Sequence, residues 1–141
     1  MTDTGYLRPI PEPTPDSKPY WDGLRAGRFL VQRCRACGEL RHYPRPLCSA
    51  CWSFDTEWTA LSGRGTVHSW TVCHHAFLPA FKAEIPYIVA IVDLDGGVRA
   101  NLPLMGAADQ EISIGMPVEI AYRAASDALT LPVLVKARTD A

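Results

Sequence analysis

The chain has 141 residues, of which 48% are hydrophobic and 21% are charged, and its formal net charge is −1 at pH 7. This composition is typical of a globular protein, no apolar run approaches the roughly 20 residues that span a bilayer, and the near-neutral charge is a poor match for nucleic acid. The first residues show no basic start followed by an apolar run, so the sequence predicts no signal peptide and a cytoplasmic protein.

Residues 1–19 form a proline-rich arm with little apolar surface for a core of its own. Prolines favour extended, polyproline-like backbone, so the arm is either loose or lies against this chain or a partner. A short helix is predicted over residues 17–26, with Ser17 or Asp16 as its N-cap. The apolar side chains of this region exceed what a short helix and a small ribbon easily bury, which favours a partner surface. They are Tyr20, Trp21, Leu24, Phe29 and Leu30.

Two C-x-x-C motifs, separated by ten residues, follow the arm. Residues 28–33 and 40–43 are predicted strands that pair as a ribbon hairpin. Two facing motifs present four thiolates to one ion in a closed tetrahedral site, so the sequence predicts one structural zinc, with iron in the same geometry as the alternative. A closed site leaves no position for a catalytic water, and disulfides would need an oxidising compartment. The predicted ligands are Cys34, Cys37, Cys48 and Cys51.

Charge is distributed unevenly along the chain. Residues 1–45 carry eight basic and five acidic side chains, whereas residues 46–141 carry six basic and ten acidic ones. Three interpretations of the basic excess remain open: a solvated face, a site for an anionic partner or phosphate-bearing ligand, and balance for the formal charge of a zinc–tetrathiolate centre. The arginines around the first cysteine motif are Arg25, Arg28, Arg33, Arg35, Arg41 and Arg45.

Alternating apolar and polar residues, which indicate half-buried strands, recur from residue 56 onward. Asp95-Gly96-Gly97 predicts a hairpin turn, and residues 79–86 predict a loop with Phe77 and Phe81 as anchors. About five strands over residues 56–137 suit a small barrel of the oligonucleotide/oligosaccharide-binding (OB) type, whereas a sandwich would need more strands. We therefore predict a mainly β chain in three parts: an arm and helix at 1–27, a zinc ribbon at 28–55 and an OB-fold domain at 56–141.

Several other residues have side chains that are capable of catalysis or metal binding. Cys73-His74-His75, with His68 upstream, could supply a nucleophile and base or a second metal site, but neighbouring strand residues point to opposite faces. Asp93 and Asp95 are explained by the hairpin turn, and Trp58 and Trp70 are better explained by packing than by base stacking. The sequence thus predicts no catalytic residues, and Cys73 is predicted to lie outside the metal site.

The chain resembles a family of small bacterial and archaeal proteins in which a rubredoxin-like zinc ribbon precedes an OB-fold. The resemblance covers residues 20–135. It departs from the family's pattern at Ser49, where proline is frequent, and at Leu134, where phenylalanine is frequent. The matching segments are Gly23-Leu24 with Gly27, Cys34-x-x-Cys37-Gly38, Pro44-Arg45, Cys48-x-x-Cys51, Glu57-Trp58, residues 62–67, Pro86-Tyr87, residues 92–98 and residues 114–118.

This resemblance implies a non-catalytic subunit that assembles with an enzyme acting on acyl-CoA. Family members are similar to partners of thiolase-fold enzymes, including acyl transferases and aldolases that shorten steroid side chains held as CoA esters, and of hotdog-fold hydratases. It also implies a structural zinc and a contribution to CoA binding. The sequence does not indicate which residues would bind CoA.

Two other functions compete with the accessory-subunit interpretation. A single-stranded nucleic-acid-binding module is the alternative, because ribbon and OB-fold are often paired there, but it would need a positive groove and the barrel half is acidic. An independent enzyme is the third, and it lacks a convincing catalytic constellation. The sequence names neither the partner enzyme nor the acyl group.

Overall fold

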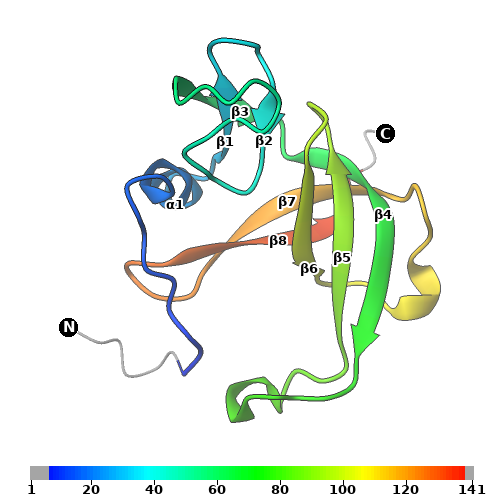
Figure 1. Cartoon of the computed structure of the whole chain (residues 1–141). Coiled ribbons are helices and arrows are strands. Elements are labelled where there is room, and N and C mark those ends of the chain that lie inside the picture. The colour runs from blue at the N-terminus through cyan, green and yellow to red at the C-terminus, as the bar shows by residue number, and fades with distance from the viewer. Residues whose placement is uncertain (1–6, 139–141) are drawn as a thin grey trace.

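The computed structural model describes residues 7–138 and has one short helix followed by two β-structures (Figure 1). Within these residues, no helix is long and apolar enough to cross a membrane. The elements are α1 (Lys18–Arg25), β1 (Phe29–Cys34), β2 (Leu40–Arg41), β3 (Thr56–Leu61), β4 (Arg64–Cys73), the 3-10 turn η1 (Pro79–Phe81), β5 (Tyr87–Leu94), β6 (Arg99–Leu104), the 3-10 turn η2 (Asp109–Glu111), β7 (Pro117–Ala124) and β8 (Thr130–Lys136).

The ribbon is a three-stranded antiparallel sheet in the order β2-β1-β3. The predicted hairpin of β1 and β2 is confirmed, with Gln32 paired to Arg41. The grouping of β3 with the barrel is wrong, because β3 pairs with β1 along its whole length, from Phe29↔Leu61 to Cys34↔Thr56. Strand β3 thus completes the ribbon sheet. The domain boundary at residue 55 stays a prediction.

The second β-structure is a closed five-stranded barrel in the order β4-β5-β6-β8-β7. Strands β4, β5 and β6 form an antiparallel meander, and β7 pairs with both β8 and the start of β4. The predicted turn joins β5 to β6, where Gly96 and Gly97 take φ values of 110° and 89° that favour glycine. The mainly β fold, with its short helix, ribbon and OB-type barrel, is confirmed.

The core joins the helix and the ribbon to the barrel. Tyr20 is 6% exposed, and Leu24 and Phe29 are fully buried in the same apolar cluster as the barrel residues. Trp21 packs against that cluster. The prediction that these side chains form a partner surface is therefore wrong for Tyr20, Leu24 and Phe29, because α1 lies against β1, β7 and β8. Leu30 is half-buried and lies outside the cluster.

The start of α1 differs from the sequence-based expectation. Ser17 occupies the N-cap position, but its side chain makes no capping hydrogen bond. Its Oγ instead accepts a hydrogen bond from the N–H of Thr14 at 2.9 Å, while the Thr14 carbonyl accepts from the N–H groups of Ser17 and Lys18. Pro19 lies within the first helical turn, where its missing N–H would have no partner in the helix.

The described part of the arm lies against its own chain. Arg8 forms an ion pair with Glu84 at 2.5 Å, and its guanidinium carbon lies 4.2 Å from the centroid of the Phe81 ring. Phe81 therefore acts as the predicted anchor of the loop around η1. Phe77 does not, because its side chain is 87% exposed. Residues 1–6 of the predicted arm lie outside the described residues.

Candidate metal centre

Four cysteine sulfurs converge at the end of the ribbon sheet. All four Sγ atoms lie within 4.8 Å of one another, with Cys34 Sγ 3.5 Å from Cys51 Sγ and Cys37 Sγ 3.6 Å from Cys48 Sγ. A zinc ion with Zn–S bonds of about 2.3 Å in tetrahedral geometry separates its sulfurs by about 3.8 Å. The donor set and its spacing thus fit one tetrahedral thiophilic ion, zinc first and iron second.

The two cysteine motifs fold as matching turns. In the first, the Cys34 N–H donates to the Glu39 carbonyl at 2.9 Å and the Gly38 N–H donates to the Cys34 carbonyl at 2.8 Å. The second repeats the pattern: the Cys48 N–H donates to the Ser53 carbonyl at 3.0 Å and the Trp52 N–H to the Cys48 carbonyl at 2.9 Å. Each turn therefore aims its two sulfurs and nearby backbone N–H groups toward a common centre.

These backbone N–H groups favour the thiolate form of the first cysteine of each motif. The Cys37 N–H lowers the pKa of the Cys34 thiol, and the N–H groups of Cys51 and Ala50 lower the pKa of Cys48 to about 6. Cys34 and Cys48 are buried, whereas Cys37 and Cys51 face solvent. The backbone of the two turns therefore favours anionic ligands at Cys34 and Cys48, whereas the neighbouring sulfurs and desolvation raise the pKa of Cys37 and Cys51.

The other candidate residues lie apart from this centre. Within the described residues, the four cysteines are the only cluster of three or more His, Cys, Asp or Glu side chains able to hold one ion. Cys73 ends β4 opposite Tyr87, and His68 instead contacts Asp93, which also binds Arg99 at 2.5 Å. The structure thus does not bring Cys73 to a histidine base, and it leaves the carboxylate of Asp93 in an ion pair.

The second turn carries a residue that the sequence analysis missed. Trp52 occupies the position that Gly38 occupies in the first turn, and both have positive φ, 65° for Trp52 and 82° for Gly38. An L-residue in this left-handed region costs about 1–2 kcal/mol. The Trp52 side chain is 76% exposed, and nearby Phe54 is 75% exposed. The turn therefore keeps a strained, exposed aromatic residue where a glycine would fit without strain.

Replacing Trp52 with glycine is expected to raise the free energy of unfolding of the metal-loaded chain by about 1 kcal/mol, because the backbone strain disappears and little packing is lost. Denaturant titration measures the change. Gly38→Ala, the matched variant in the first turn, should lower the same quantity. A less stable Trp52→Gly protein would show that contacts of the indole outweigh the strain.

A buried arginine links the three ribbon strands through hydrogen bonds. Arg41 is 5% exposed, so it does not belong to the predicted basic surface. Its Nε donates to Gln32 Oε1 at 2.9 Å, and its Nη2 donates to Thr56 Oγ1 at 2.7 Å and to the Arg45 carbonyl at 2.9 Å. These bonds link β2 to β1 and β3. Arg25 contacts Asp22, and Arg35 lies near Asp55 and Glu57, so the basic excess is smaller at the surface than in the sequence.

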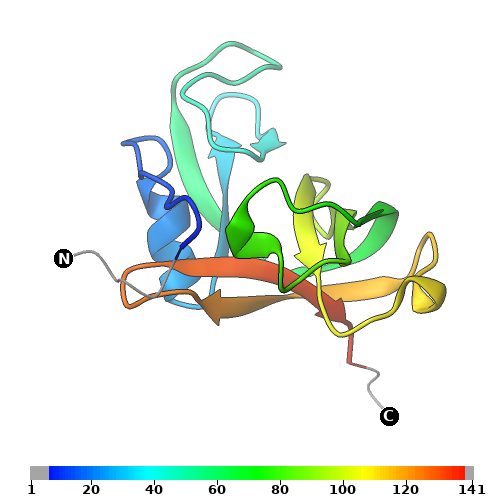
Figure 2. The same ribbon diagram turned by 90° about the horizontal axis from the view of Figure 1, so that it is seen from below.

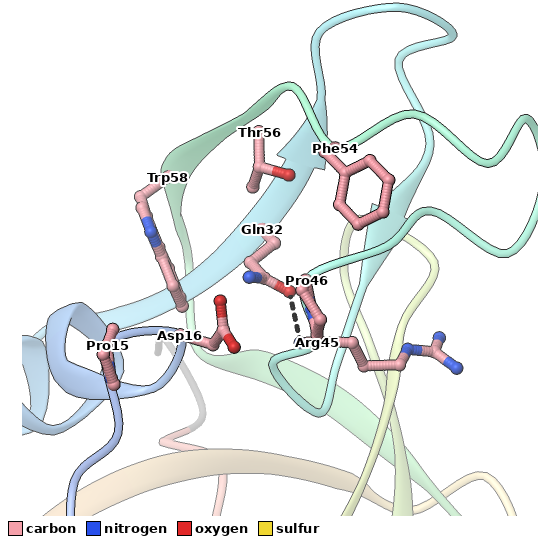
Figure 3. Close-up of a pocket in the computed structure, with 8 residues that line it drawn as sticks. All are labelled: Pro15, Asp16, Gln32, Arg45, Pro46, Phe54, Thr56 and Trp58. Carbon is pink, nitrogen blue, oxygen red and sulfur yellow. Dashed lines mark hydrogen bonds between the residues drawn. The ribbon is translucent and has the colours of Figure 1, made fainter.

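A small cavity of about 280 Å³ opens beside the Arg41 hydrogen bonds, between the arm and the ribbon (Figure 3). Gln32 Oε1 accepts a hydrogen bond from the Arg45 N–H at 2.8 Å, whereas the Arg45 side chain extends away from the cavity. Asp16 and Trp58 complete its walls. Gln32 and Thr56, two of its polar residues, already bind Arg41, and the cavity lies where the arm meets the ribbon.

A closed four-cysteine ribbon joined to a five-stranded OB-type barrel defines a two-module, metal-binding class of proteins. Residues 21–57 match the family model described as "ChsH2, rubredoxin-like zinc ribbon domain", and residues 58–123 match "ChsH2, C-terminal OB-fold domain". The chain belongs to this ChsH2/DUF35 family. The resemblance predicted from the sequence is thus confirmed.

Individual relatives carry the same two modules. The chain is 43% identical over 127 residues to a probable enoyl-CoA hydratase alpha subunit of Thermomonospora curvata, covering 90% of this chain and 39% of that protein. It therefore spans about two fifths of that relative's length. A DUF35 domain-containing scaffold protein of Methanocaldococcus jannaschii is 33% identical, with 73% of this chain and 74% of that protein covered. A solved chain from the "Ltp2-ChsH2(DUF35) aldolase" superposes with a TM-score of 0.82 at 41% identity, covering 90% of this chain and 98% of that one.

Proposed function

We propose that this chain is the accessory, zinc-containing subunit of a thiolase-fold enzyme that acts on acyl-CoA esters. The observation that carries the proposal is the likeness to the solved aldolase chain, which spans both modules at 41% identity. The scaffold relative of Methanocaldococcus jannaschii supports a non-catalytic role, and the hydratase subunit supports CoA-ester chemistry in the partner. These relatives favour this function over a nucleic-acid-binding module.

The proposed reaction belongs to the partner, with retro-aldol cleavage of a CoA ester as the first candidate because the solved relative is named an aldolase. In this chain, Cys34, Cys37, Cys48 and Cys51 would hold the zinc ion, which supplies folding free energy to the ribbon when bound. Four thiolates leave no position for a substrate or water on the ion. The contribution of this chain is then to present surfaces that bind and order the partner.

Exposed aromatic side chains of the ribbon support a docking role for this module. Trp52 and Phe54 are about three-quarters exposed, and Tyr43 is 52% exposed. Aromatic residues and arginine are enriched at protein interfaces, and Arg33 and Arg45 are exposed on the same module. Strain at Trp52 is also consistent with a residue kept for binding rather than for the stability of the isolated chain.

Co-expression with an Ltp2-type thiolase-fold subunit, followed by size-exclusion chromatography, tests the proposed function. We expect the two chains to co-elute and to turn over an acyl-CoA ester, while this chain alone shows no turnover. Separate elution of the two chains would contradict the partnership. Steady hydrolysis, thiolysis or aldol cleavage by the pure isolated chain would contradict the non-catalytic role.

Deleting residues 1–15 is expected to leave the zinc content and the fold unchanged but to weaken partner binding about tenfold, which corresponds to 1.4 kcal/mol. The fold should persist because the arm's larger apolar side chains, Leu7 and Ile10, are 79% and 54% exposed and add little to the core. Isothermal titration with the partner measures the dissociation constant. Arg8→Ala, which releases the arm from Glu84 and Phe81 without removing it, separates the arm's own contacts from its attachment. Equal affinities of the truncated and full-length chains would show that the arm takes no part in binding.

A further inference from the structure

A second cavity, of about 920 Å³, opens at the barrel, and none of the four clustered cysteines lines it. It is bordered by the arm, α1, the segment around η1, and strands β5, β6, β7 and β8. Figure 2 shows the green segment that carries η1 and the red strand β8 on the same side of the molecule. A cavity of this size at the mouth of a small barrel matches the volume of ordinary small-molecule sites.

The way in which β6 and β8 meet explains why the barrel is hollow here. Only Leu104 and Leu134 are in register between these parallel strands, and the Met105 N–H donates to the Leu134 carbonyl at 2.9 Å. Pro103 and Pro132, which precede this pair on the two strands, both line the cavity. Proline has no N–H to extend a ladder, so the two strands diverge and leave room between them.

The cavity wall is mostly apolar, with a few polar groups that face into it. Tyr20 lines the cavity and is 6% exposed, and its hydroxyl makes no hydrogen bond with any other described residue. Burial raises the pKa of Tyr20, so its hydroxyl stays protonated and can donate. Tyr43 Oη accepts the Asn101 N–H at 2.9 Å, which leaves its own proton free to donate. The apolar wall includes Phe81, Ile88, Leu102, Leu104, Leu131 and Val133.

Charge at the cavity rim favours a single negative group. Arg8 and Glu84 line the cavity and neutralise each other in their ion pair. Arg123 also lines it and has no carboxylate partner among the described residues, with its Nη1 3.7 Å from the Met105 sulfur. The lining therefore carries one unbalanced positive charge and two hydroxyl donors.

We propose that this cavity binds an apolar monocarboxylate, with its hydrocarbon body between β6 and β8 and its carboxylate held by Arg123 and by the hydroxyls of Tyr20 and Tyr43. This binding site goes beyond the proposed function and does not depend on the identity of the partner. The apolar wall sets the preference for a hydrophobic body, and the donors set the preference for an acceptor group at one end.

Titration of the full-length, zinc-loaded chain with anthracene-2-carboxylate, a rigid fluorescent monoanion, tests the proposal, with its methyl ester as the uncharged probe. We expect saturable one-to-one binding of the acid and at least tenfold weaker binding of the ester. Tyr20→Phe should weaken binding of the acid about three- to tenfold, the range of one hydrogen bond, and Arg123→Gln about tenfold or more. Tyr122→Phe is the matched control, because this neighbouring tyrosine lies outside the cavity lining, and it should bind like the unmodified chain.

Several outcomes would overturn the proposal. They are the absence of saturable binding up to about 1 mM, equal affinity for the acid and its ester, and unchanged affinity in Tyr20→Phe. Circular dichroism of each variant shows whether it is folded. If Tyr20→Phe is unstable, Ala107→Trp takes its place, because a large side chain at this half-exposed lining position should fill the cavity and abolish binding; circular dichroism checks that the core, against which Ala107 packs, stays folded.

Discussion

Replacing Cys48 with serine is expected to unfold the ribbon and to release the bound zinc. Cys48 is 1% exposed, and its sulfur lies 3.6 Å from that of Cys37 in the four-cysteine cluster. Metal binding to such a module contributes roughly 10 kcal/mol or more of folding free energy, which is comparable with the whole stability of a typical domain. A serine hydroxyl is a poor zinc ligand and leaves the other three thiolates facing one another without an ion.

Elemental analysis and circular dichroism measure this effect. The unmodified chain should hold one equivalent of zinc, and Cys48→Ser should hold little and lose the signal of the ribbon sheet. Cys73→Ser is the matched control, since Cys73 lies on β4 outside the cluster and its loss should change neither zinc content nor melting temperature appreciably. Less than half an equivalent of zinc in the freshly purified, unmodified chain would count against the site. Iron in place of zinc would keep the ligand set and change the ion.

Local features of this protein were readable from the sequence. The spacing of the cysteine motifs predicted which sulfurs converge, because each motif folds within a few residues of its own cysteines. The Asp95-Gly96-Gly97 turn was predicted for the same reason, as positive φ at two successive positions requires glycine. Alternation along residues 66–72, within β4, and the apolar run of β5 predicted two strands of the barrel.

The misjudged features depend on partners distant in sequence. The alternation of β3 predicts a strand but not that its neighbour is β1, about 27 residues earlier, rather than the barrel. Arg41 resembles a surface charge in the sequence, but in the fold Gln32, Thr56 and the Arg45 carbonyl bring three acceptors to its guanidinium. Tyr20 and Phe29 appeared as surplus apolar area because the sequence does not show that α1 lies over the barrel. Only a comparison of the two cysteine turns, residue by residue, could have identified Trp52 at a glycine-like position.

Replacing His42 with phenylalanine is expected to remove much of the acid sensitivity of this chain between pH 6.5 and 4. The His42 ring lies among aromatic rings, 4.1 Å from Tyr43, 5.2 Å from Phe29 and 5.4 Å from Tyr20 between centroids. Both ring nitrogens are buried without a hydrogen-bond partner among the described residues. Burial lowers the pKa of His42 to about 4, because the positive imidazolium loses its hydration there.

The direction of the pH effect follows from the difference between the folded and unfolded chains. A histidine in the unfolded chain has a pKa of about 6.5 and therefore binds a proton below that pH. In the folded chain His42 stays neutral until the pH falls to about 4. The stability associated with His42 is therefore complete above pH 6.5, falls as the pH drops toward 4 and levels off below it. A gap of about 2.5 pKa units corresponds to roughly 3 kcal/mol.

Phenylalanine keeps an aromatic ring in the cluster and removes both unpaired nitrogens, so His42→Phe should be at least as stable as the unmodified chain at pH 7 and more stable at pH 4.5. Denaturant titrations across pH 4.5 to 7 measure the two curves. Zinc release at low pH lowers both curves alike, so the difference between them isolates His42. His74→Phe, at an exposed position, should reproduce the slope of the unmodified chain. Parallel curves for His42→Phe and the unmodified chain would mean that the folded chain accepts a proton at His42 as readily as the unfolded one, and that the aromatic cluster opens to water.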